Sequence, residues 1–420
     1  MTRTGGVSVL GAGVVGICCA RFLQKEGFDV TLIDRDEPGT GTSSGNLGMI
    51  CSLETSLPLP SMRVLCGAPK MLLDPYGALV VRWRHLPHLL PWLARFVRNA
   101  APSRRWGHAQ VMATLMRNTV MAYDSLIEGS SARGLIRHDG AVVVYETDDG
   151  FAADAGERAM LKRLGADFDE LEGAAIHDLE PALAPNFVRG VHHRGCAQTH
   201  SPLGLSLALL DDFRRDGGTI RRANASAISV DAGQSPVIET DCGAIPTESL
   251  VVSCGAWSGR LAASVGLKVP LEAERGYHMA VPGFDSGLRR PIIHGESNIG
   301  LTQMIEGLRI GGTVELAGLE APPTPGRAQR IYDVGRRMLA DPEHAATAAL
   351  SDWMGYRPTL PDYLPAIGPS PHHANLWFAF GHQHVGLSLA ARTGQLIATL
   401  LAGRSPDIDL EPFRVDRFGP

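Results

Sequence analysis

Several features that mark other classes of protein are missing from this chain of 420 residues. Its seven cysteines form no CxxC pair and show no disulfide or metal-ligand spacing, which favours a reducing compartment. A net charge of −5 gives no electrostatic reason to expect nucleic-acid binding. No apolar run reaches the roughly 18 residues of a membrane-spanning helix, and the first is too short and glycine-interrupted for a signal peptide. These absences predict a cytoplasmic protein.

The chain has enough residues, 44% of them hydrophobic, to form two or three domains. Its most informative motif is VSVLGAGVVGICCARFLQKEGFDVTLID at residues 7–34. Residues 7–10 predict a buried strand, 17–26 a helix and 29–33 a second strand. A GxGxxG turn joins the first strand to the helix: Gly11, Ala12, Gly13, Val14, Val15 and Gly16. This order predicts a dinucleotide-binding βαβ unit.

The glycines of this turn have separate predicted roles. Gly11 allows the tight turn, Gly13 lets the backbone approach a pyrophosphate, and Gly16 lets the helix pack close to the strand. The helix N-terminus offers unpaired N–H groups and partial positive charge to the phosphates. Asp34, followed by Arg35, is placed to bind a ribose 2′-hydroxyl, which argues against NADP. The alternative is a glycine-rich turn with no ligand.

A loop rich in Gly, Ser, Thr and Asn follows at residues 35–50. We expect hydroxyl and backbone N–H groups of this loop to contact the same cofactor: Ser43, Ser44, Asn46, Gly48 and Met49. The alternative is a plain surface loop. Residues 41–45 also match the G-x-S-x-G nucleophile elbow of hydrolases. That elbow requires a preceding strand and a following helix, and this chain has loop residues on both sides.

Residues 74–100 form a basic, aromatic segment interrupted by prolines. Contact with a membrane surface or a partner is one interpretation, and a pair of ordinary helices covering a second domain is the favoured one. Further along, the pattern predicts a helix over 108–129, a strand over 141–147, a helix over 151–165 and a loop over 180–195. The adjacent histidines of that loop are poor chelators, and no metal site is expected.

The second half predicts a helix over 201–215 and short strands over 219–230, where Ala227 or a neighbouring residue is expected to give a backbone contact to adenine. A buried strand over 249–254 ends at Gly255 and repeats the strand–glycine–helix order. Residues 271–282 and 292–315 predict antiparallel hairpins, and 325–340 a helix. Near the C-terminus, the pattern predicts a strand over 376–380, a glycine turn and a helix over 387–401. The N-terminus of this helix would favour negative charge on a bound group at the turn.

Three motifs together resemble the FAD-dependent amine and amino-acid oxidoreductases, the D-amino-acid oxidase superfamily. They are residues 9–34, the SSGNLGMI loop at 43–50, and GYRPTLPDYLPAIG with FGHQHVGLSLA between 355 and 390. The resemblance covers essentially the whole chain. SSGN and the RIGGTVEL segment at 309–316 are most similar to the bacterial D-amino-acid dehydrogenases.

The resemblance implies an α/β fold with a Rossmann-type FAD-binding domain and an α+β substrate domain with a mostly antiparallel sheet. We expect the FAD domain at 1–52, 152–268 and 355–420, and the substrate domain at 53–151 and 269–354. Gly381, His382, His384, Val385, Gly386 and Leu387 would lie at the flavin ring, and Arg357 would bind the substrate carboxylate. Tyr277 and His278 are further candidates for substrate contact. No cysteine matches a covalent flavin attachment, so non-covalent FAD is expected.

The implied reaction transfers a hydride from Cα of a D-amino acid to flavin N5, and the imine is hydrolysed to a keto acid and ammonia. Cyclic secondary amino acids are included among the substrates. Electrons would pass to a quinone or another carrier, with loose contact to the inner face of a membrane left open. The alternatives are a glycine or sarcosine oxidase that uses oxygen, a non-catalytic FAD subunit of a larger complex, and, as a poorer fit, an NAD-dependent dehydrogenase. The sequence names neither the amino acid nor the oligomeric state.

Overall fold

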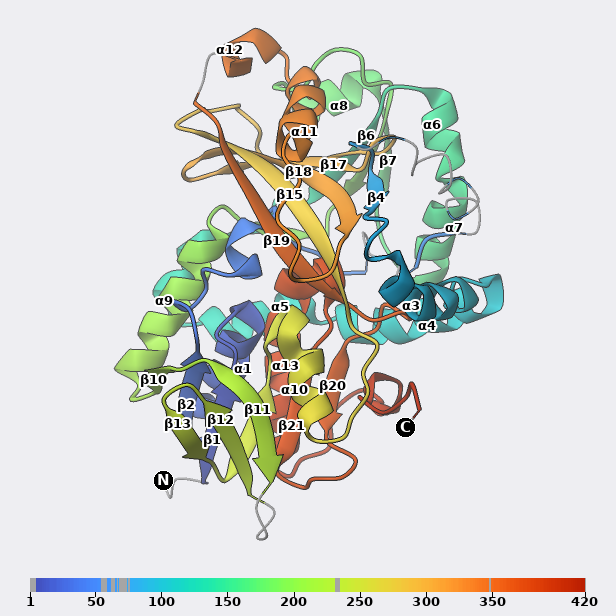
Figure 1. The fold of residues 1–420 in the computed structure, drawn as a ribbon. Helices are drawn as coiled ribbons and strands as arrows, with labels where there is room; N and C mark the ends of the chain where they lie inside the picture. The colour runs from blue at the N-terminus through green and yellow to red at the C-terminus, as the bar shows by residue number, and fades with distance from the viewer. Residues whose placement is uncertain are drawn as a thin grey trace.

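The structure is a computed structural model that describes residues 5–53, 59–61, 65, 67, 74, 76–230, 235–346 and 349–419. Two large sheets lie one above the other, as Figure 1 shows, and chain segments from both halves of the sequence enter each of them. The predicted α/β class, with a parallel and a mostly antiparallel sheet, is confirmed.

The lower sheet in Figure 1 has six strands in the order β10-β2-β1-β14-β21-β20. Neighbouring strands are parallel except for the pair β20 and β21. The strands, in chain order, are β1 (Gly6–Leu10), β2 (Asp29–Asp34), β10 (Thr219–Arg222), β14 (Ser249–Val252), β20 (Ala366–Pro369) and β21 (Leu376–Phe380). The strands predicted at residues 7–10, 29–33, 249–254 and 376–380 therefore lie side by side in one sheet.

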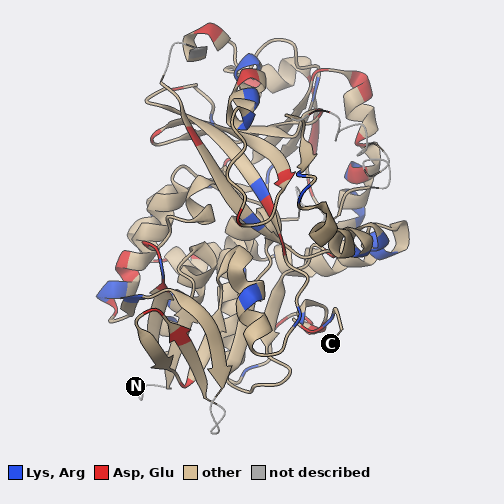
Figure 2. Ribbon diagram, viewed as in Figure 1, with Lys and Arg blue, Asp and Glu red and all other residues tan. Residues whose placement is uncertain are grey.

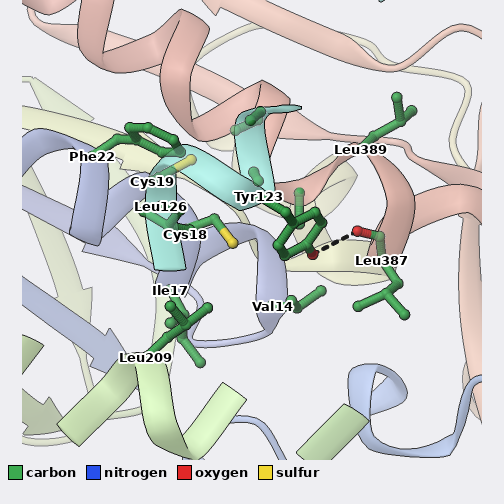
Figure 3. Close-up of a cluster of buried hydrophobic side chains, with 14 of the residues drawn as sticks. Val14, Ile17, Cys18, Cys19, Phe22, Tyr123, Leu126, Leu209, Leu387 and Leu389 are labelled. Carbon is green, nitrogen blue, oxygen red and sulfur yellow. Dashed lines mark hydrogen bonds between the residues drawn. The ribbon is translucent and has the colours of Figure 1, made fainter. Parts of the chain in front are cut away.

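Side chains alternate between the two faces of this sheet, as the two-residue period of a strand requires. In β1, Val7 and Val9 pack under helices α1 (Val14–Lys25) and α13 (Gly386–Leu401), and Leu10 packs on the opposite face. Helices α5 (Thr119–Ile127) and α9 (Pro202–Arg215) extend the first layer. Figure 3 shows this core, where the Tyr123 hydroxyl donates to the carbonyl oxygen of Leu387 at 2.7 Å.

The other face is covered by helix α10 (Ser258–Ser264) and a three-stranded antiparallel meander. The strands of the meander are β11 (Ala225–Val230), β12 (Pro236–Thr240) and β13 (Gly243–Pro246). A second small sheet joins loop segments at the centre of the molecule, from β3 (Met49–Ile50), β5 (Ile136–Arg137) and β9 (Ala197–Thr199).

The upper sheet has nine strands, in the order β19-β15-β18-β17-β16-β6-β8-β7 with β4 paired to β18. They are β4 (Leu79–Val81), β6 (Ala141–Tyr145), β7 (Asp169–Glu172), β8 (Arg189–His193), β15 (Glu272–Pro282), β16 (Ile292–His294), β17 (Ile299–Met304), β18 (Gly307–Leu316) and β19 (Ser351–Thr359). The hairpins predicted at 271–282 and 292–315 are its central strands. One face packs on helix α11 (Arg327–Gly335).

The remaining helices border the two sheets in Figure 1. They are α3 (Leu86–Asn99), α4 (Pro102–Met116), α6 (Asp148–Ala153), α7 (Ala155–Leu164), α8 (Gly173–Leu179) and α12 (Pro342–Ala346). Short 3₁₀ turns are η1 (Thr42–Gly45), η2 (Ser131–Leu135), η3 (Gly255–Trp257), η4 (Arg336–Met338), η5 (Gln383–Val385) and η6 (Glu411–Phe413). Among the described residues, no helix combines the length and the apolar character needed to cross a bilayer.

Several expectations differ from the structure. The described residues of 74–100, expected as a pair of helices, form strand β4 and the single helix α3, and the helix predicted over 151–165 is divided into α6 and α7. The helix predicted over 108–129 is two helices, α4 and α5, separated at residues 117 and 118. The loop predicted over 180–195 contains strand β8. His193 on this strand is buried, and that burial lowers the pKa of its imidazole to about 4. The expected domain boundary at residue 152 does not coincide with the sheets, because β7 and β8 belong to the nine-stranded sheet.

The contact between Gly16 of α1 and the turn before it leaves no room for a side chain. A Cβ atom on Gly16 would lie 1.8 Å from the carbonyl oxygen of Gly11 and 2.7 Å from Ser253 Oγ. We expect Gly16→Ala to lower the free energy of unfolding by about 1–3 kcal/mol, as overpacking does. Gly107→Ala in α4 is the matched control, because no atom lies within 4 Å of a Cβ added there. This substitution should raise the free energy of unfolding by about 0.5–1 kcal/mol. Thermal denaturation followed by circular dichroism measures both, and equal stability of Gly16→Ala and the wild type would contradict this packing.

Candidate active site

A cavity of about 1430 Å³ lies between the two large sheets. One end is formed by the carboxyl ends of β1, β2 and β14, which is where α/β sheets bind their ligands. The other end is formed by β15, β18, β19 and helix α3. Both predicted halves of the site, the nucleotide end and the substrate end, therefore open into one continuous space.

The glycine turn after β1 has the geometry that its sequence predicts. Gly11 has a φ of +105°, and a Cβ there would lie 2.5 Å from the carbonyl oxygen of Ser253. Gly13 and Val14 line the cavity, and α1 carries no acidic residue in its first turn. Gly16 instead faces the Gly11 carbonyl, so it serves helix packing. The N-terminus of α1 is thereby presented to the cavity with room for a phosphate.

Asp34 ends β2 at the wall of the cavity, beside the same turn. Its Oδ2 accepts from the backbone N–H of Ala12 at 2.5 Å, and its Oδ1 accepts from that of Asp36 at 3.0 Å. A carboxylate can accept further bonds through its remaining lone pairs. The guanidinium of Arg35 lies 4.2 Å from the ring centre of Trp257, and both residues line the cavity with Gly255. This corner suits a ribose and an adenine.

The Ser/Asn loop at 42–48 is fastened by its own polar groups. Ser43 Oγ accepts from the N–H of Val14 at 2.9 Å, and Asn46 bonds to the carbonyl of Ser43 and the N–H of Gly48. Ser44 Oγ donates back to the carbonyl oxygens of residues 40 and 41, so it does not face the cavity. No strand leads directly into this turn, because the loop residues 35–41 separate it from β2, which removes the nucleophile-elbow interpretation.

His278 and Trp353 support that loop from the large sheet. Nδ1 of His278 donates to the carbonyl oxygen of Gly45 at 2.8 Å, and its ring stacks on Trp353 at 4.9 Å. Burial, with the nearby charge of Arg309, lowers the pKa of His278 to about 4. The neutral imidazole therefore orients the loop that lines the cavity. Direct contact of His278 with substrate stays a prediction.

Arg357 lies on β19, at the sheet end of the cavity. Its Nη1 donates to the carbonyl oxygen of Thr313 at 2.9 Å, and a Cβ on Gly276 would lie 2.4 Å from its Nη2. Desolvation lowers the pKa of Arg357, and the nearby Glu274 opposes that shift. Within the described ranges, Arg357 makes no ion pair, and its half-buried side chain opens into the cavity. Such a guanidinium can bind a carboxylate with two parallel hydrogen bonds.

Glu274 provides a buried carboxylate beside Arg357. The two residues are directly opposite each other in the pairing of β15 with β19. Its Oε1 accepts from the hydroxyl of Tyr363 at 2.8 Å, and desolvation raises the pKa of Glu274. The carbonyl oxygen of Tyr363 accepts from Nε2 of Gln383 at 2.6 Å. Tyr363 and Gln383 both have positive φ angles, +63° and +44°. Sequence patterns give no sign of this group, because strand register and backbone angles create it.

The C-terminal turn places the N-terminus of α13 at the cavity wall. Gly381 has a φ of +85°, and Nε2 of His382 lies 2.9 Å from Thr393 Oγ1. Burial lowers the pKa of His382 to about 3. His384 projects into the cavity, where desolvation and then the charge of Arg357 lower its pKa to about 4. Val385, Gly386 and Leu387 complete this wall as the first residues of the helix.

Most of the predicted site residues line the cavity, and five do not: Gly16, Ser44, Gly48, Ala227 and Gly381. Gly48 and Gly381 shape turns with positive φ. Ala227 lies inside β11, and the neighbouring residues 223–226 reach the cavity, so the predicted adenine contact falls to a neighbour of Ala227 and stays a prediction. Tyr277 lines the cavity, but its hydroxyl donates to Glu315 at 2.5 Å and accepts from the N–H of Thr324 at 3.0 Å.

The fold and this cavity define a dinucleotide-binding oxidoreductase. A sequence model of the family described as "DAO: FAD dependent oxidoreductase" matches residues 7–400, and the chain belongs to that family. It is 34% identical to a D-amino-acid oxidase of Bradyrhizobium diazoefficiens and 29% identical to a D-amino acid dehydrogenase of the same organism, over 98% of each chain. A glycine oxidase structure from Geobacillus kaustophilus superposes with a TM-score of 0.75 at 20% identity, covering 99% of both chains.

FAD fits the residues at the nucleotide end. The glycine turn, the N-terminus of α1 at the cavity wall and the carboxylate of Asp34 provide the donor and acceptor set that an ADP moiety requires. The cavity then continues to the N-terminus of α13, where a flavin would lie within reach of Arg357. In the part of the chain that the structure describes, no three His, Cys, Asp or Glu side chains are grouped as metal ligands.

Asp34 offers a test of the predicted ribose contact. Asp34→Asn removes the negative charge and one acceptor, so we expect the dissociation constant for FAD to rise by about tenfold or more. Flavin fluorescence titration of the apoprotein measures this constant. Asp29→Asn, at the exposed start of the same strand and outside the cavity, should bind FAD like the wild type. An unchanged FAD affinity in Asp34→Asn would remove Asp34 from the cofactor site.

Proposed function

We propose that this protein oxidises D-amino acids to imino acids, which water converts to keto acids and ammonia. The observation that carries this proposal is the position of Arg357, a desolvated guanidinium without an ion-pair partner among the described residues, at the flavin end of the cavity. The D configuration is supported by the names of the relatives, a D-amino-acid oxidase and several D-amino acid dehydrogenases.

Arg357 binds the substrate carboxylate, and the Thr313 carbonyl fixes the plane of the guanidinium through its hydrogen bond. FAD, when bound, supplies the acceptor for the hydride of the substrate Cα. The low pKa of His384 keeps this imidazole neutral at pH 7, so it adds no positive charge beside the substrate amine. The apolar walls exclude water from the reacting carbon.

Anaerobic absorbance spectra test this function directly. We expect D-amino acids, and not their L enantiomers, to bleach the flavin bands of the purified protein. Arg357→Met should raise the substrate concentration for half-maximal bleaching by about 30-fold or more, since removing one partner of a buried charge pair costs about 2–5 kcal/mol. Arg330→Met, on the exposed face of α11, is the control and should leave that concentration unchanged.

Two results would contradict the proposal. Flavin that no D-amino acid bleaches would exclude the activity, and bleaching by glycine or sarcosine alone would favour a glycine-type oxidase, as the structural likeness to glycine oxidase allows. Hydrogen peroxide formed in air would identify oxygen as the electron acceptor in place of a quinone.

A quinone or another membrane-linked carrier is the acceptor that the surface of α3 favours. Residues 75–123 contain seven arginines and no Asp or Glu, and Figure 2 shows no acidic position on α3 or α4. Trp83, Leu90 and Val97 are 71%, 55% and 49% exposed, and Trp83 and Val97 also border the cavity. Four exposed arginines beside them make no ion pair among the described residues: Arg84, Arg95, Arg98 and Arg104. Exposed apolar and basic side chains gathered in one segment of the chain suit an anionic bilayer surface.

Vesicle binding tests this membrane contact. We expect the protein to sediment with vesicles that contain phosphatidylglycerol and not with phosphatidylcholine vesicles. Leu90→Asp should reduce the bound fraction severalfold, because it adds a negative charge to the apolar face. Ile305→Asp, at a turn of the large sheet where the side chain is 68% exposed, makes the same change elsewhere and should bind normally. Equal binding of both variants would show that α3 is not the membrane face.

A further inference from the structure

The substrate end of the cavity has an apolar wall that the amino-acid backbone of a substrate does not need. The wall comes from β4, α3 and the end of β18: Leu79, Val81, Trp92, Leu93, Phe96 and Leu316. Leu79, Val81 and Leu93 are only half-buried, so part of their apolar surface faces the cavity. These residues pack together as one hydrophobic cluster, which gives the wall a fixed shape.

Aromatic rings connect this wall to the position of the substrate carboxylate. Trp92 stacks on Phe96 at 4.8 Å, Phe96 lies 5.5 Å from the ring of Tyr363, and Tyr363 lies 6.3 Å from His384. Nε1 of Trp92 donates to the carbonyl oxygen of Thr359, two residues after Arg357. A substrate whose carboxylate binds Arg357 therefore has an aromatic and aliphatic surface within reach of its side chain.

Of the charged groups that the structure describes at this end, Glu274 already has a partner and Arg357 is assigned to the α-carboxylate of the substrate. Glu274 accepts from the Tyr363 hydroxyl, and its negative charge stands beside Arg357. His384 is neutral at pH 7. The wall itself contributes aliphatic and aromatic side chains only. Among the described residues, a lysine-like side chain would find no free carboxylate there, and an acidic side chain would compete with its own α-carboxylate for Arg357. Burying either charge without a partner is unfavourable.

We propose that the wall binds the side chain of a large apolar D-amino acid, such as an aromatic or branched aliphatic one. This inference rests on the proposed function and adds the substrate class. One methylene in an apolar pocket changes kcat/KM by about 10–200-fold. The wall should therefore separate D-phenylalanine and D-leucine from D-alanine by at least about tenfold.

Rapid-mixing measurement of flavin reduction in the holoenzyme, without oxygen, tests the substrate class. The substrates are D-phenylalanine, D-leucine, D-alanine, D-glutamate and D-lysine. We expect the two large apolar substrates to give the highest second-order rate constants. Faster reduction by D-alanine, D-glutamate or D-lysine would overturn the inference and leave the D-amino-acid activity intact. No reduction by any of the five, nor by other D-amino acids, would instead contradict the proposed function.

A variant locates the selectivity in the wall. Leu93→Ala should lower the rate constant for D-phenylalanine by about tenfold and that for D-alanine by less than threefold. Leu207→Ala, on the exposed face of α9, makes the same substitution outside the cavity and should change neither value. Phe96→Leu provides a second, conservative change at the buried part of the wall, with the same expected direction. If both wall variants keep the wild-type ratio of the two substrates, the side chain binds elsewhere.

Discussion

The loop at residues 42–48 holds the two sheets together, and the site depends on that junction. On one side, Ser43 Oγ accepts from the N–H of Val14 at the start of α1. On the other, Arg309 donates to the carbonyl oxygens of Ser44 and Asn46, at 2.9 and 2.6 Å, and Thr302 donates to that of Leu47. Val14 belongs to the helix that covers the six-stranded sheet, and Arg309 and Thr302 belong to the nine-stranded sheet. Hydrogen bonds to one short segment of backbone therefore connect the phosphate end to the sheet that carries Arg357.

Features that depend on neighbouring residues could be predicted from the sequence. The GxGxxG turn and Asp34 are close in the chain, and the close contact of Gly16 with Gly11 follows from the length of one turn. Features that depend on strand register could not. Glu274 is opposite Arg357 only because β15 pairs with β19, 83 residues further along. The same register and the fold of residues 315–324 turn the Tyr277 hydroxyl toward Glu315, away from the expected substrate contact.

Backbone strain is concentrated at the substrate end. A left-handed conformation costs a residue other than glycine about 1–3 kcal/mol and persists only where surrounding bonds fix it. Tyr363 and Gln383 both adopt it, and the bond from Gln383 Nε2 to the Tyr363 carbonyl joins them. The side chain of Tyr363 is held in turn by Glu274. The ring that continues the apolar wall toward His384 is thus fixed at both its backbone and its hydroxyl.

The incomplete pairing of the charged groups of Arg357 and Glu274 explains why this end of the cavity suits an anion. Burial disfavours the charge on both, lowering the pKa of Arg357 and raising that of Glu274. A direct ion pair would reduce both pKa shifts. However, the Tyr363 hydroxyl occupies one oxygen of Glu274, and the carbonyl of Thr313 holds the guanidinium of Arg357 in another direction. The guanidinium is therefore left with unsatisfied donors in a desolvated space. A substrate carboxylate bound at Arg357, as we propose, would supply the missing acceptors and recover energy that the folded protein alone leaves unused.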